Sequence, residues 1–322
     1  MYPNVRMRRL RKSKRVRDLT AETRLHPDEF VLPIFFDERL SEEKATGSMP
    51  GISTFPLGGY DGIASEIQNS GVNSVLVFGV PSKKDARGSG AHAADGVVQK
   101  AISGLKENSD LLVVADLCLC EYTDHGHCGV LDEVGWVKND ETLELYAKTA
   151  VSQAAAGADI IAPSGMMDGQ IFAVRTALDD AGFEEVPIMA YSAKFFSAYY
   201  GPFRDVACSA PDRGDRAGYQ MPCGNRKEAI REIALDVEEG ADIIMVKPAG
   251  PYLDIVRDAA DMFDLPLAAY QVSGEYSMIK AAARNGWIDE DRVMMESLLG
   301  IKRAGADIII TYYAKEAARK LM

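Results

Sequence analysis

The sequence predicts an α/β fold, a (β/α)8 TIM barrel with an extended N-terminal arm. Eight short apolar runs alternate with segments of helical periodicity, and each run is continuously apolar. Continuous apolar runs are typical of parallel strands that are covered on both faces. A doubly wound open sheet is the rival fold, but no glycine-rich phosphate-binding motif follows the first run, as that fold would favour. The alternation therefore indicates a barrel.

The eight predicted strands are residues 30–36, 74–80, 111–119, 160–164, 187–192, 243–248, 267–273 and 308–313. Amphipathic segments at 140–156, 225–239 and 290–304 predict helices between them. We expect helices to begin at the capping residues Asp140, Asp168 and Asn225. We expect helices to end at the glycines Gly157, Gly182, Gly240 and Gly305.

Three helix-to-strand junctions have nearly the same sequence, GADII at 157–161 and at 240–244 and GADIII at 305–310. Glycine readily takes the backbone conformation that ends a helix, and the small alanine allows close packing. The aspartate is expected to cap the junction before the strand enters the core. A repeated junction fits a fold built from repeated strand and helix units.

The formal charge of −12, from 36 Lys and Arg against 48 Asp and Glu, is unevenly distributed along the 322 residues. Residues 1–17 contain eight basic side chains and no acidic one, so the rest of the chain carries −20. We therefore divide the chain into a basic arm, residues 1–29, and an acidic barrel, residues 30–322. A strongly acidic surface repels polyanions, so the barrel is not expected to bind nucleic acid. The arm is expected to contact the acidic surface of a partner subunit.

No apolar run approaches the roughly 18–20 residues that a membrane-spanning helix needs, and no signal-peptide core follows the basic N-terminus. We expect a soluble, cytoplasmic protein with no membrane partner. Five cysteines, an odd number, do not suggest a disulfide framework in a chain of this size. Three of them lie close together in the sequence, which indicates a different role.

Cys118, Cys120 and Cys128 belong to the segment DLCLCEYTDHGHC at the end of the third predicted strand. Side chains alternate along a strand, so Asp116, Cys118 and Cys120 are expected on one face. If Cys128 returns to them from the following loop, three thiolates converge and leave a fourth position open, as in catalytic zinc sites. The alternative is that these cysteines are small buried residues of the core.

The four histidines are too few for a separate histidine-based metal site. His125 and His127, inside the cysteine segment, are alternative ligands or neighbours of the ion, and the spacing does not assign them. His26 and His92 have no obvious partners in the sequence.

Two lysines lie at the ends of consecutive predicted strands. Lys194 follows the fifth strand and Lys247 lies near the end of the sixth. In a barrel both would emerge at the C-terminal ends of the strands, where the active sites of this fold lie. Two ammonium groups in a partly desolvated pocket repel each other, so at least one should have a lowered pKa. A neutral amine attacks ketones to form a Schiff base; the alternative is a pair of ordinary surface charges.

Residues 195–224 show little periodicity and separate Lys194 from the next predicted helix. Loops of this length in compact domains are commonly functional, so we expect an active-site lid. Its arginines, whose forked guanidinium groups suit a carboxylate substrate, are Arg204, Arg213 and Arg216, and Gln220 lies nearby. The alternative is a solvated loop whose arginines pair with Asp205, Asp212 and Asp215.

Five segments, in order along the chain, resemble the porphobilinogen synthases, also called 5-aminolevulinate dehydratases. They are DLCLCEYTDHGHC, MAYSAKF, GDRAGYQMP, IIMVKPAGPYLDI and AAYQVSGEYSMIKAA. The resemblance extends from the basic arm to Tyr313. It implies a hydro-lyase that condenses two 5-aminolevulinate molecules into porphobilinogen, with loss of two waters, in tetrapyrrole (haem) biosynthesis.

The resemblance also implies roles for the residues that match the family motifs. Lys247 and Lys194 would form Schiff bases with the two substrates, Lys247 with the one that supplies the propionate side of the product. Arg204, Arg216 and Gln220 would hold one carboxylate, and Ser273 and Tyr312 would bind the other. The remaining pocket residues would be Tyr191, Ser164, Asp116, Phe203 and Tyr270. Asp116 is also a candidate for proton transfer.

Family members differ in metal use, and the three intact cysteines imply the zinc-dependent type. Gly218 stands where some animal members place an additional cysteine ligand, so a second zinc held in that way is not expected. Cys208 and Cys223 receive no role.

Glu232, on the predicted helix 225–239, matches the outer magnesium site of many bacterial members. In the family this site stimulates activity by stabilising the oligomer; the alternative for Glu232 is a solvated helical carboxylate. The resemblance further implies a homo-octamer, and thus an allosteric enzyme, assembled from dimers whose arms wrap a neighbouring barrel.

Two other functions remain open from the residues alone. A class I aldolase on a similar barrel would use one Schiff-base lysine and no thiolate-bound zinc. A nucleic-acid-binding protein would act through residues 6–17, and its binding would weaken steeply with salt.

Overall fold

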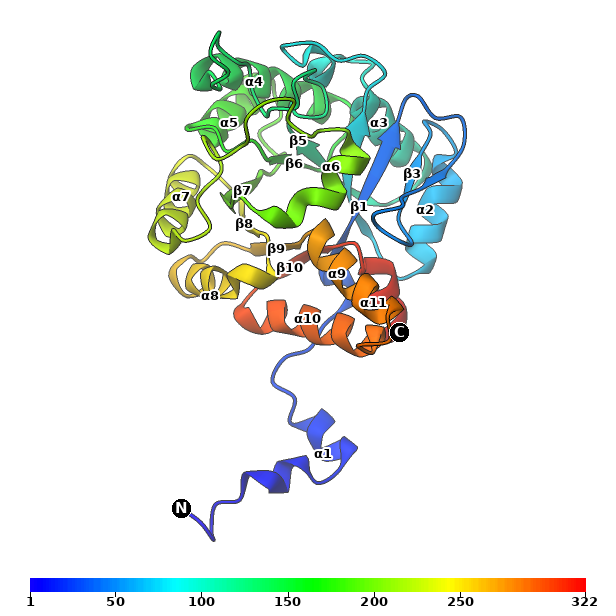
Figure 1. Ribbon diagram of the computed structural model, residues 1–322, viewed down its shortest axis with the longest axis vertical. Coiled ribbons are helices and arrows are strands. Elements are labelled where there is room, and N and C mark those ends of the chain that lie inside the picture. Colours follow the sequence, from blue (N-terminus) through cyan, green and yellow to red (C-terminus); the bar gives the residue numbers. More distant parts are fainter.

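Eight parallel strands surround the centre of the molecule in the computed structural model, which describes residues 1–322 (Figure 1). They are β1 (Phe30–Asp37), β4 (Ser74–Val80), β5 (Leu112–Leu117), β6 (Ile160–Pro163), β7 (Met189–Lys194), β8 (Ile243–Lys247), β9 (Leu267–Gln271) and β10 (Ile308–Thr311). They pair in the order β6-β5-β4-β1-β10-β9-β8-β7. A bridge between Ile161 and Ile188 joins β6 to the start of β7 and closes the ring. The predicted barrel is confirmed.

Each barrel strand leads into a helix on the outside of the ring, as Figure 1 shows in a view along the barrel. These helices are α2 (Tyr60–Asn69), α3 (Val97–Asn108), α4 (Asn139–Ala155), α5 (Gln170–Asp180), α7 (Arg226–Glu238), α8 (Leu253–Met262), α10 (Glu290–Ala304) and α11 (Ala314–Leu321). An additional helix, α9 (Ser273–Arg284), lies between β9 and α10. A small hairpin of β2 (Lys44–Ala45) and β3 (Ser53–Phe55) follows β1.

The strand ends differ from the predicted bounds where the site is built. The third barrel strand ends at Leu117, two residues earlier than predicted, because the N–H groups of Tyr122 and Thr123 bond to Leu119 O in a turn. Cys118 therefore directly follows the strand and Cys120 lies in this turn, so the two are not on one face of a strand. β7 extends to Lys194, with an irregular register against β8 between Ala190 and Ala193.

The segment predicted as an aperiodic lid is partly helical. It contains a 3-10 turn at Ala198–Tyr200 and the short helix α6 (Gly201–Ala207). The Ser197 hydroxyl caps the turn by accepting from Tyr199 N at 3.2 Å, and Pro202 lies in the first turn of α6, where its missing N–H costs nothing. Figure 1 shows α6 across one end of the barrel.

The predicted capping residues differ in part from the observed helix starts. Lys138 and not Asp140 occupies the N-cap of α4, and Gly169 and not Asp168 occupies that of α5. Asn225 is the N-cap of α7, but its side chain donates to Glu228 and accepts no backbone bond. The predicted helix-ending glycines all have positive φ angles, at Gly157, Gly182, Gly240 and Gly305.

The aspartates of the repeated GAD junctions link neighbouring strands through hydrogen bonds. Each aspartate carboxylate accepts a hydrogen bond from a backbone N–H at the start of the adjacent strand: Asp159 from Val113 (2.7 Å), Asp242 from Ile188 (2.7 Å) and Asp307 from Leu267 (3.0 Å). A charged acceptor strengthens such a bond. The aspartates therefore fix the strand spacing at the N-terminal end of the barrel, opposite the lid.

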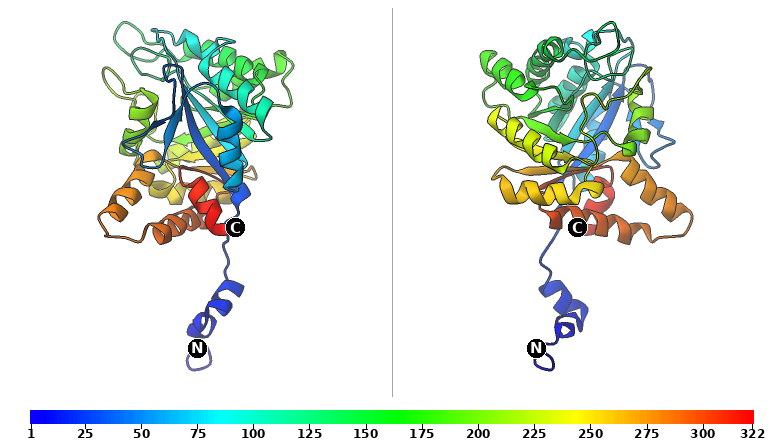
Figure 2. Two further views of the ribbon diagram at one scale, coloured as in Figure 1. Left: turned by 90° about the vertical axis from the view of Figure 1, so that its right-hand side faces the viewer. Right: turned by 60° about the vertical axis from the view of Figure 1, so that its left-hand side comes forward.

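The arm stands away from the barrel that it precedes (Figure 2). It contains a 3-10 turn, Met7–Arg11, and α1 (Lys14–Leu19), and neither element has a buried residue. Met7, Leu10 and Leu19 are all exposed there. No helix of the structure is both long enough and apolar enough to cross a membrane. A cytoplasmic location stays a prediction.

Candidate active site

Lys194 and Lys247 end the neighbouring strands β7 and β8, and they are register partners in the parallel pairing. Both side chains are buried, with exposed fractions of 5% and 6%. Lys194 Nζ donates to the backbone oxygen of Ser164 at 2.5 Å. The two predicted amines therefore come from adjacent strand ends at the lid end of the barrel, where TIM-barrel active sites lie.

Lys247 Nζ is surrounded by aromatic rings. The ring centroid of Tyr270 lies 4.1 Å from Nζ and that of Tyr191 lies 4.9 Å away, with Phe203 and Tyr200 at 5.5 and 5.6 Å. Burial, together with the Lys194 charge, lowers the pKa of Lys247 to about 7, although the negative charge of Asp116 opposes the shift. Much of Lys247 is then an unprotonated nucleophile at neutral pH.

Asp116 is a buried carboxylate near both lysines. Its Oδ2 accepts from Ser164 Oγ at 3.2 Å, whereas its Oδ1 has no hydrogen-bond partner. Burial raises the pKa of Asp116, and the charges of Lys247 and Lys194 oppose this rise. An unpartnered carboxylate oxygen with a raised pKa is suited to accept and return a proton.

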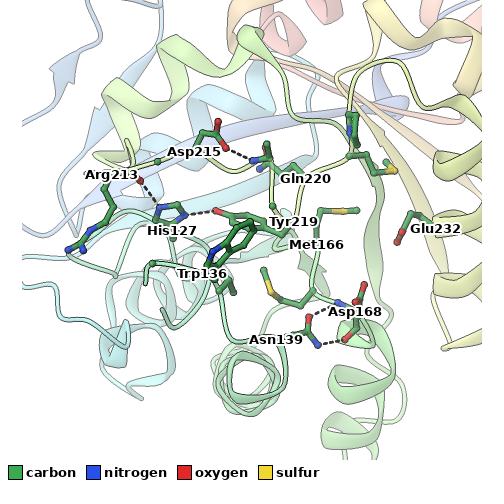
Figure 3. A pocket seen from close by; sticks show the side chains of 18 of the residues that line it. His127, Trp136, Asn139, Met166, Asp168, Arg213, Asp215, Tyr219, Gln220 and Glu232 are labelled. Carbon is green, nitrogen blue, oxygen red and sulfur yellow. Dashed lines mark hydrogen bonds between the residues drawn. The ribbon is translucent and has the colours of Figure 1, made fainter. Parts of the chain in front are cut away.

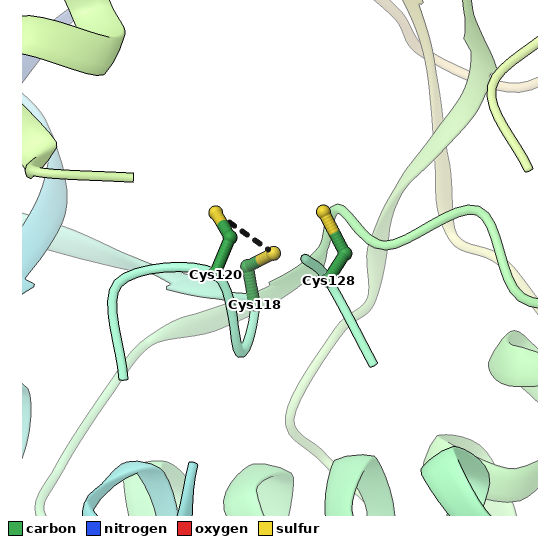
Figure 4. A group of neighbouring side chains, drawn as sticks. All are labelled: Cys118, Cys120 and Cys128. Carbon is green, nitrogen blue, oxygen red and sulfur yellow. Dashed lines mark hydrogen bonds between the residues drawn. The ribbon is translucent and has the colours of Figure 1, made fainter. Parts of the chain in front are cut away.

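The three clustered cysteines converge in space. The sulfur atoms of Cys118, Cys120 and Cys128 all lie within 4.8 Å of one another, and the Cys118 to Cys120 distance is 3.4 Å. Figure 4 shows Cys118 and Cys120 side by side, with Cys128 beside them on a separate segment. All three are buried, free thiols. The turn after β5 thus produces the convergence that we had expected from strand alternation.

The thiols influence one another strongly. Burial raises the pKa of Cys118, and bonds to Cys118 and Cys128 raise the pKa of Cys120. Bonds to Cys118 and Cys120 lower the pKa of Cys128. One thiolate is stabilised by two thiols, and three buried thiolates together require a cation among them. Sulfur donors in this number fit zinc, so the cluster can hold a metal.

The two histidines of the cysteine segment are bonded to protein groups. His125 Nδ1 accepts from His127 N at 3.1 Å, and its Nε2 lies 3.2 Å from Ala86 O. His127 Nε2 lies 2.9 Å from Arg213 O, and its Nδ1 lies 3.3 Å from Tyr219 Oη. Only the cysteines form the metal-binding group. His127 therefore connects the cysteine loop to the lid, whereas the His125 side chain contacts the loop that follows β4.

The lid carries three polar side chains with buried atoms, of which Arg216 and Gln220 are buried and Arg204 is half-buried. Nε of Arg204, Nε of Arg216 and both amide atoms of Gln220 are buried without a partner, although Arg216 Nη2 donates to Gly126 O and Ser209 O. Burial, together with the Arg216 charge, lowers the pKa of Arg204. Neither arginine pairs with a lid aspartate. The solvated-loop alternative holds only for Arg213, which is exposed and pairs with Asp212 at 3.6 Å. Two crowded guanidinium groups with free donors suit an anion.

Ser273 and Tyr312 lie just beyond two strands. Ser273 is the first residue of α9, and its Oγ accepts from Phe203 N of the lid at 3.0 Å. Tyr312 follows β10 directly, one residue past the strand in which we had expected it, and its hydroxyl lies 3.3 Å from that of Tyr270. Both are buried beside the aromatic rings around Lys247.

A cavity of about 870 Å³ lies against the lid (Figure 3). Lid residues Tyr219 and Gln220 form part of its wall, whereas neither lysine lines it. Glu232 of α7 points into it and is half-buried. Burial, then the charges of Asp168 and Glu228, raise the pKa of Glu232. Crowded carboxylates of this kind are suited to a cation.

Gly218 also lines this cavity, and a β-carbon there would lie 3.0 Å from the Trp136 ring. Cys208 and Cys223 are exposed and lie outside the metal-binding group.

Two residues near the site were missed from the sequence. Tyr146 of α4 donates its hydroxyl to Cys128 O at 2.8 Å, and nothing in the sequence connects positions so far apart. Glu275 lies in the first turn of α9 and accepts from Gly250 N and Val272 N, both at 2.8 Å. The sequence gives no capping-box signal for it, because Val272 has no side-chain acceptor to match a glutamate three residues later.

Known proteins with the same sequence pattern and fold agree with this geometry. A sequence profile described as delta-aminolevulinic acid dehydratase matches residues 4–320. The delta-aminolevulinic acid dehydratase of Archaeoglobus fulgidus is 57% identical over 321 residues, 99% of each chain, and that of Bacillus subtilis is 56% identical over 317 residues, 98% of each. A Toxoplasma gondii delta-aminolevulinic acid dehydratase, solved in complex with the reaction product porphobilinogen, aligns with a TM-score of 0.96 at 41% identity, covering 99% of this chain and 91% of that one. The chain therefore belongs to the delta-aminolevulinic acid dehydratase family, the porphobilinogen synthases.

Proposed function

We propose that Lys194 and Lys247 carry out the reaction of this family, the condensation of two 5-aminolevulinate molecules to porphobilinogen with loss of two waters. The observation that carries the proposal is the register pairing of two buried lysines at the lid end of the barrel. Each substrate is a ketone, and each lysine can form a Schiff base with one ketone, releasing one water. Two substrates thus match two amines.

The carboxylate of each substrate has its own set of donors. Arg204, Arg216 and Gln220 reach one carboxylate from the lid, because their unpartnered donors are already buried there. Ser273 and Tyr312 bind the other, which belongs to the substrate on Lys247. Tyr191, Phe203 and Tyr270 exclude water from the Lys247 amine, which keeps its pKa low.

Asp116 moves protons within the closed site. Its free Oδ1 can accept a proton, and its position near the two lysines lets it return that proton to an amine. Ser164 orients this carboxylate through Oδ2 and also holds Lys194 through its backbone oxygen. Proton transfer and the position of Lys194 are therefore linked at one residue.

Cys118, Cys120 and Cys128 would hold the zinc ion. Two observations support this: their sulfur atoms converge, and bonds from the other two thiols lower the pKa of Cys128. A bound zinc ion supplies Lewis-acid polarisation of the carbonyl of the second substrate. Tyr146 and Tyr219 fix the Cys128 backbone from both sides, because one bonds its carbonyl and the other accepts from its N–H. The metal ligands are thereby held close to the lid.

Glu232 would hold a regulatory magnesium ion in the cavity against the lid. Asp168 and Glu228 add negative charge to the same cavity, and neither they nor Glu232 form a salt bridge. Magnesium prefers oxygen ligands and retains several waters, which a cavity of about 870 Å³ can accommodate. Because Tyr219 and Gln220 line this cavity, a cation there would also stabilise the lid.

The arm would assemble the subunits into a homo-octamer. Its apolar residues Met7 and Leu10 are exposed, and its eight basic side chains face no acidic surface of their own barrel. An arm of this kind gains apolar burial and ion pairs when it lies on a second acidic barrel.

Incubation with 5-aminolevulinate, borohydride reduction and peptide mapping tests the function. Porphobilinogen production with adducts at both Lys194 and Lys247 is expected. A single adduct with aldol chemistry and no dependence on zinc would instead favour the aldolase. Salt-sensitive nucleic-acid binding by an inert barrel would favour the third function. The absence of trapping at either lysine during turnover would rule out the proposed mechanism.

A further inference from the structure

Glu275 is a buried carboxylate in the first turn of α9 that forms no salt bridge with a cationic side chain. Its Oε2 accepts from Val272 N at 2.8 Å, which is an ordinary cap within its own helix start. Its Oε1 instead accepts from Gly250 N at 2.8 Å, in the loop that follows β8. One carboxylate therefore joins two loops that leave different barrel strands.

Each of these loops carries a residue of the proposed site. Gly250 is three residues after Lys247, and Val272 directly precedes Ser273. The loop after β8 is also joined to strand β9 itself, because Ala249 N donates to Tyr270 O at 2.8 Å. Lys247 and Ser273 thus belong to two segments that both bond to the Glu275 carboxylate.

The packing around Glu275 allows little adjustment. A β-carbon at residue 250 would lie 2.5 Å from Glu275 Oε1, so the carboxylate occupies space that only glycine leaves free. A β-carbon at residue 274 would lie 2.4 Å from Tyr199 O, so the first turn of α9 also lies against the lid. The carboxylate is held by the N–H groups of Gly250 and Val272, and the helix start that carries it lies against the lid.

We propose that Glu275 is a positioning residue that sets the distance between the Lys247 amine and the Ser273 hydroxyl. This inference rests on the proposed function, in which one substrate molecule forms a Schiff base with Lys247 and places its carboxylate at Ser273. A substrate of fixed length reacts well only if the two groups are correctly spaced. Lys194 belongs to another strand, and its loop makes no hydrogen bond to Glu275.

The test compares borohydride-trapped adducts at Lys247 and Lys194 in the full-length enzyme supplied with 5-aminolevulinate. Glu275→Gln replaces one of the two acceptor oxygens by an NH2 group, so only one of the Gly250 and Val272 N–H groups keeps its acceptor. We expect the ratio of Lys247 adduct to Lys194 adduct to fall about tenfold, with a raised KM, because small misplacements of reacting groups slow reactions by such factors. Glu275→Asp, which keeps the charge but is one methylene shorter, should give an intermediate ratio.

Asp289→Ala is the control for general loosening of a helix start. Asp289 caps α10 by accepting from Arg292 N at 3.0 Å, far along the chain from both lysines. This variant should lower the melting temperature and leave the adduct ratio unchanged. If it changes the ratio as much as Glu275→Gln does, general loosening explains the effect and the inference is wrong.

Gly250→Ala disturbs the contact between Gly250 and Glu275 from the Gly250 side. Its adduct ratio is compared with those of the Glu275 variants, after circular dichroism has shown that each variant is folded. Unchanged adduct ratios in the folded variants would overturn the role of Glu275. Failure of the proposed function has a different signature, because the wild-type enzyme itself would then give no adduct at Lys247.

Discussion

Lys194 and Lys247 occupy paired positions on β7 and β8, yet their amino groups have different surroundings. Lys194 Nζ bonds to a backbone carbonyl at 2.5 Å, whereas Lys247 Nζ forms no hydrogen bond and lies 4.1 Å from the Tyr270 ring centroid. An amine that lacks hydrogen-bond acceptors gains little from being charged. Lys247 is therefore the residue whose nucleophilic form should be governed by pH near neutrality.

The rate of Schiff-base trapping at Lys247 should rise with pH and level off above about 7. The sign follows from the lowered pKa of Lys247, about 7, because only the unprotonated amine attacks a ketone. The measurement is the initial rate of cyanoborohydride-trapped adduct at Lys247 between pH 5.5 and 9. Asp116→Asn removes a negative charge that raises this pKa, so its midpoint should move to lower pH. A wild-type midpoint near 10 would contradict the prediction.

Loss of the metal should abolish activity without unfolding the barrel. Cys128→Ser removes one of three thiolates, and Lewis-acid catalysis supplies several kcal/mol, so kcat should fall about 1,000-fold. Zinc content by mass spectrometry and the rate of porphobilinogen formation measure the two effects together. Cys223→Ser is the control, since Cys223 is an exposed thiol outside the cluster. Full activity in a zinc-free preparation would refute the role of the cluster.

The barrel could be predicted from the sequence because its buried parallel strands appear there as continuous apolar runs. The strand ends were not, because turn hydrogen bonds such as Thr123 N to Leu119 O decide them. Cys118 and Cys120 illustrate both points. Their sulfur atoms lie 3.4 Å apart although the strand ends before both residues, so the cluster was predicted correctly from an incorrect local conformation.

Contacts between distant segments were beyond the reach of the sequence pattern. Tyr146 supports Cys128 from α4, and Glu275 connects the loops that follow β8 and β9. Neither residue type indicates its partner, because tyrosines and glutamates occur on many helices. Their roles depend on tertiary packing that periodicity does not encode. The lid arginines lie between these two cases. Their suitability for binding a carboxylate could be predicted from the residue type, whereas their burial could not.

Arg204→Met and Arg216→Met should each raise KM for 5-aminolevulinate about 10- to 100-fold. Each removes a charged donor to the substrate carboxylate, which is worth about 1.5–3 kcal/mol. Steady-state kinetics measure the change. Arg213→Met, on the same lid, should have nearly wild-type KM because Arg213 is exposed and pairs only with Asp212. If all three variants behave alike, the arginines act through general lid stability and not through a carboxylate.

Asp242→Ala should lower the free energy of unfolding by about 2 kcal/mol. The carboxylate accepts from Ile188 N at 2.7 Å, and its loss leaves a strand N–H without its charged acceptor. Urea unfolding followed by circular dichroism measures the change. Asp61→Ala, at an exposed position in α2, is the control and should change this free energy by less than about 0.5 kcal/mol. Equal losses in both variants would remove any special role for the GAD aspartates.

Deletion of residues 1–20 should reduce the mass of the assembly while leaving the barrel folded. The arm contributes no buried side chain to its own barrel in this segment, so the barrel loses no core packing. Its basic charge and the −20 of the remaining chain should attract one another between subunits. Light scattering coupled to gel filtration gives the mass, and circular dichroism gives the fold.

The salt dependence separates the two forces that could hold the arm. Charge attraction at exposed sites is screened at about 1 M salt, where the Debye length is about 3 Å, whereas apolar burial is not. Met7→Ser with Leu10→Ser should therefore make the full-length assembly dissociate in high salt but not in low salt. If the truncated and full-length proteins have the same subunit number at every salt concentration, the arm plays no part in assembly, and its basic residues need another partner.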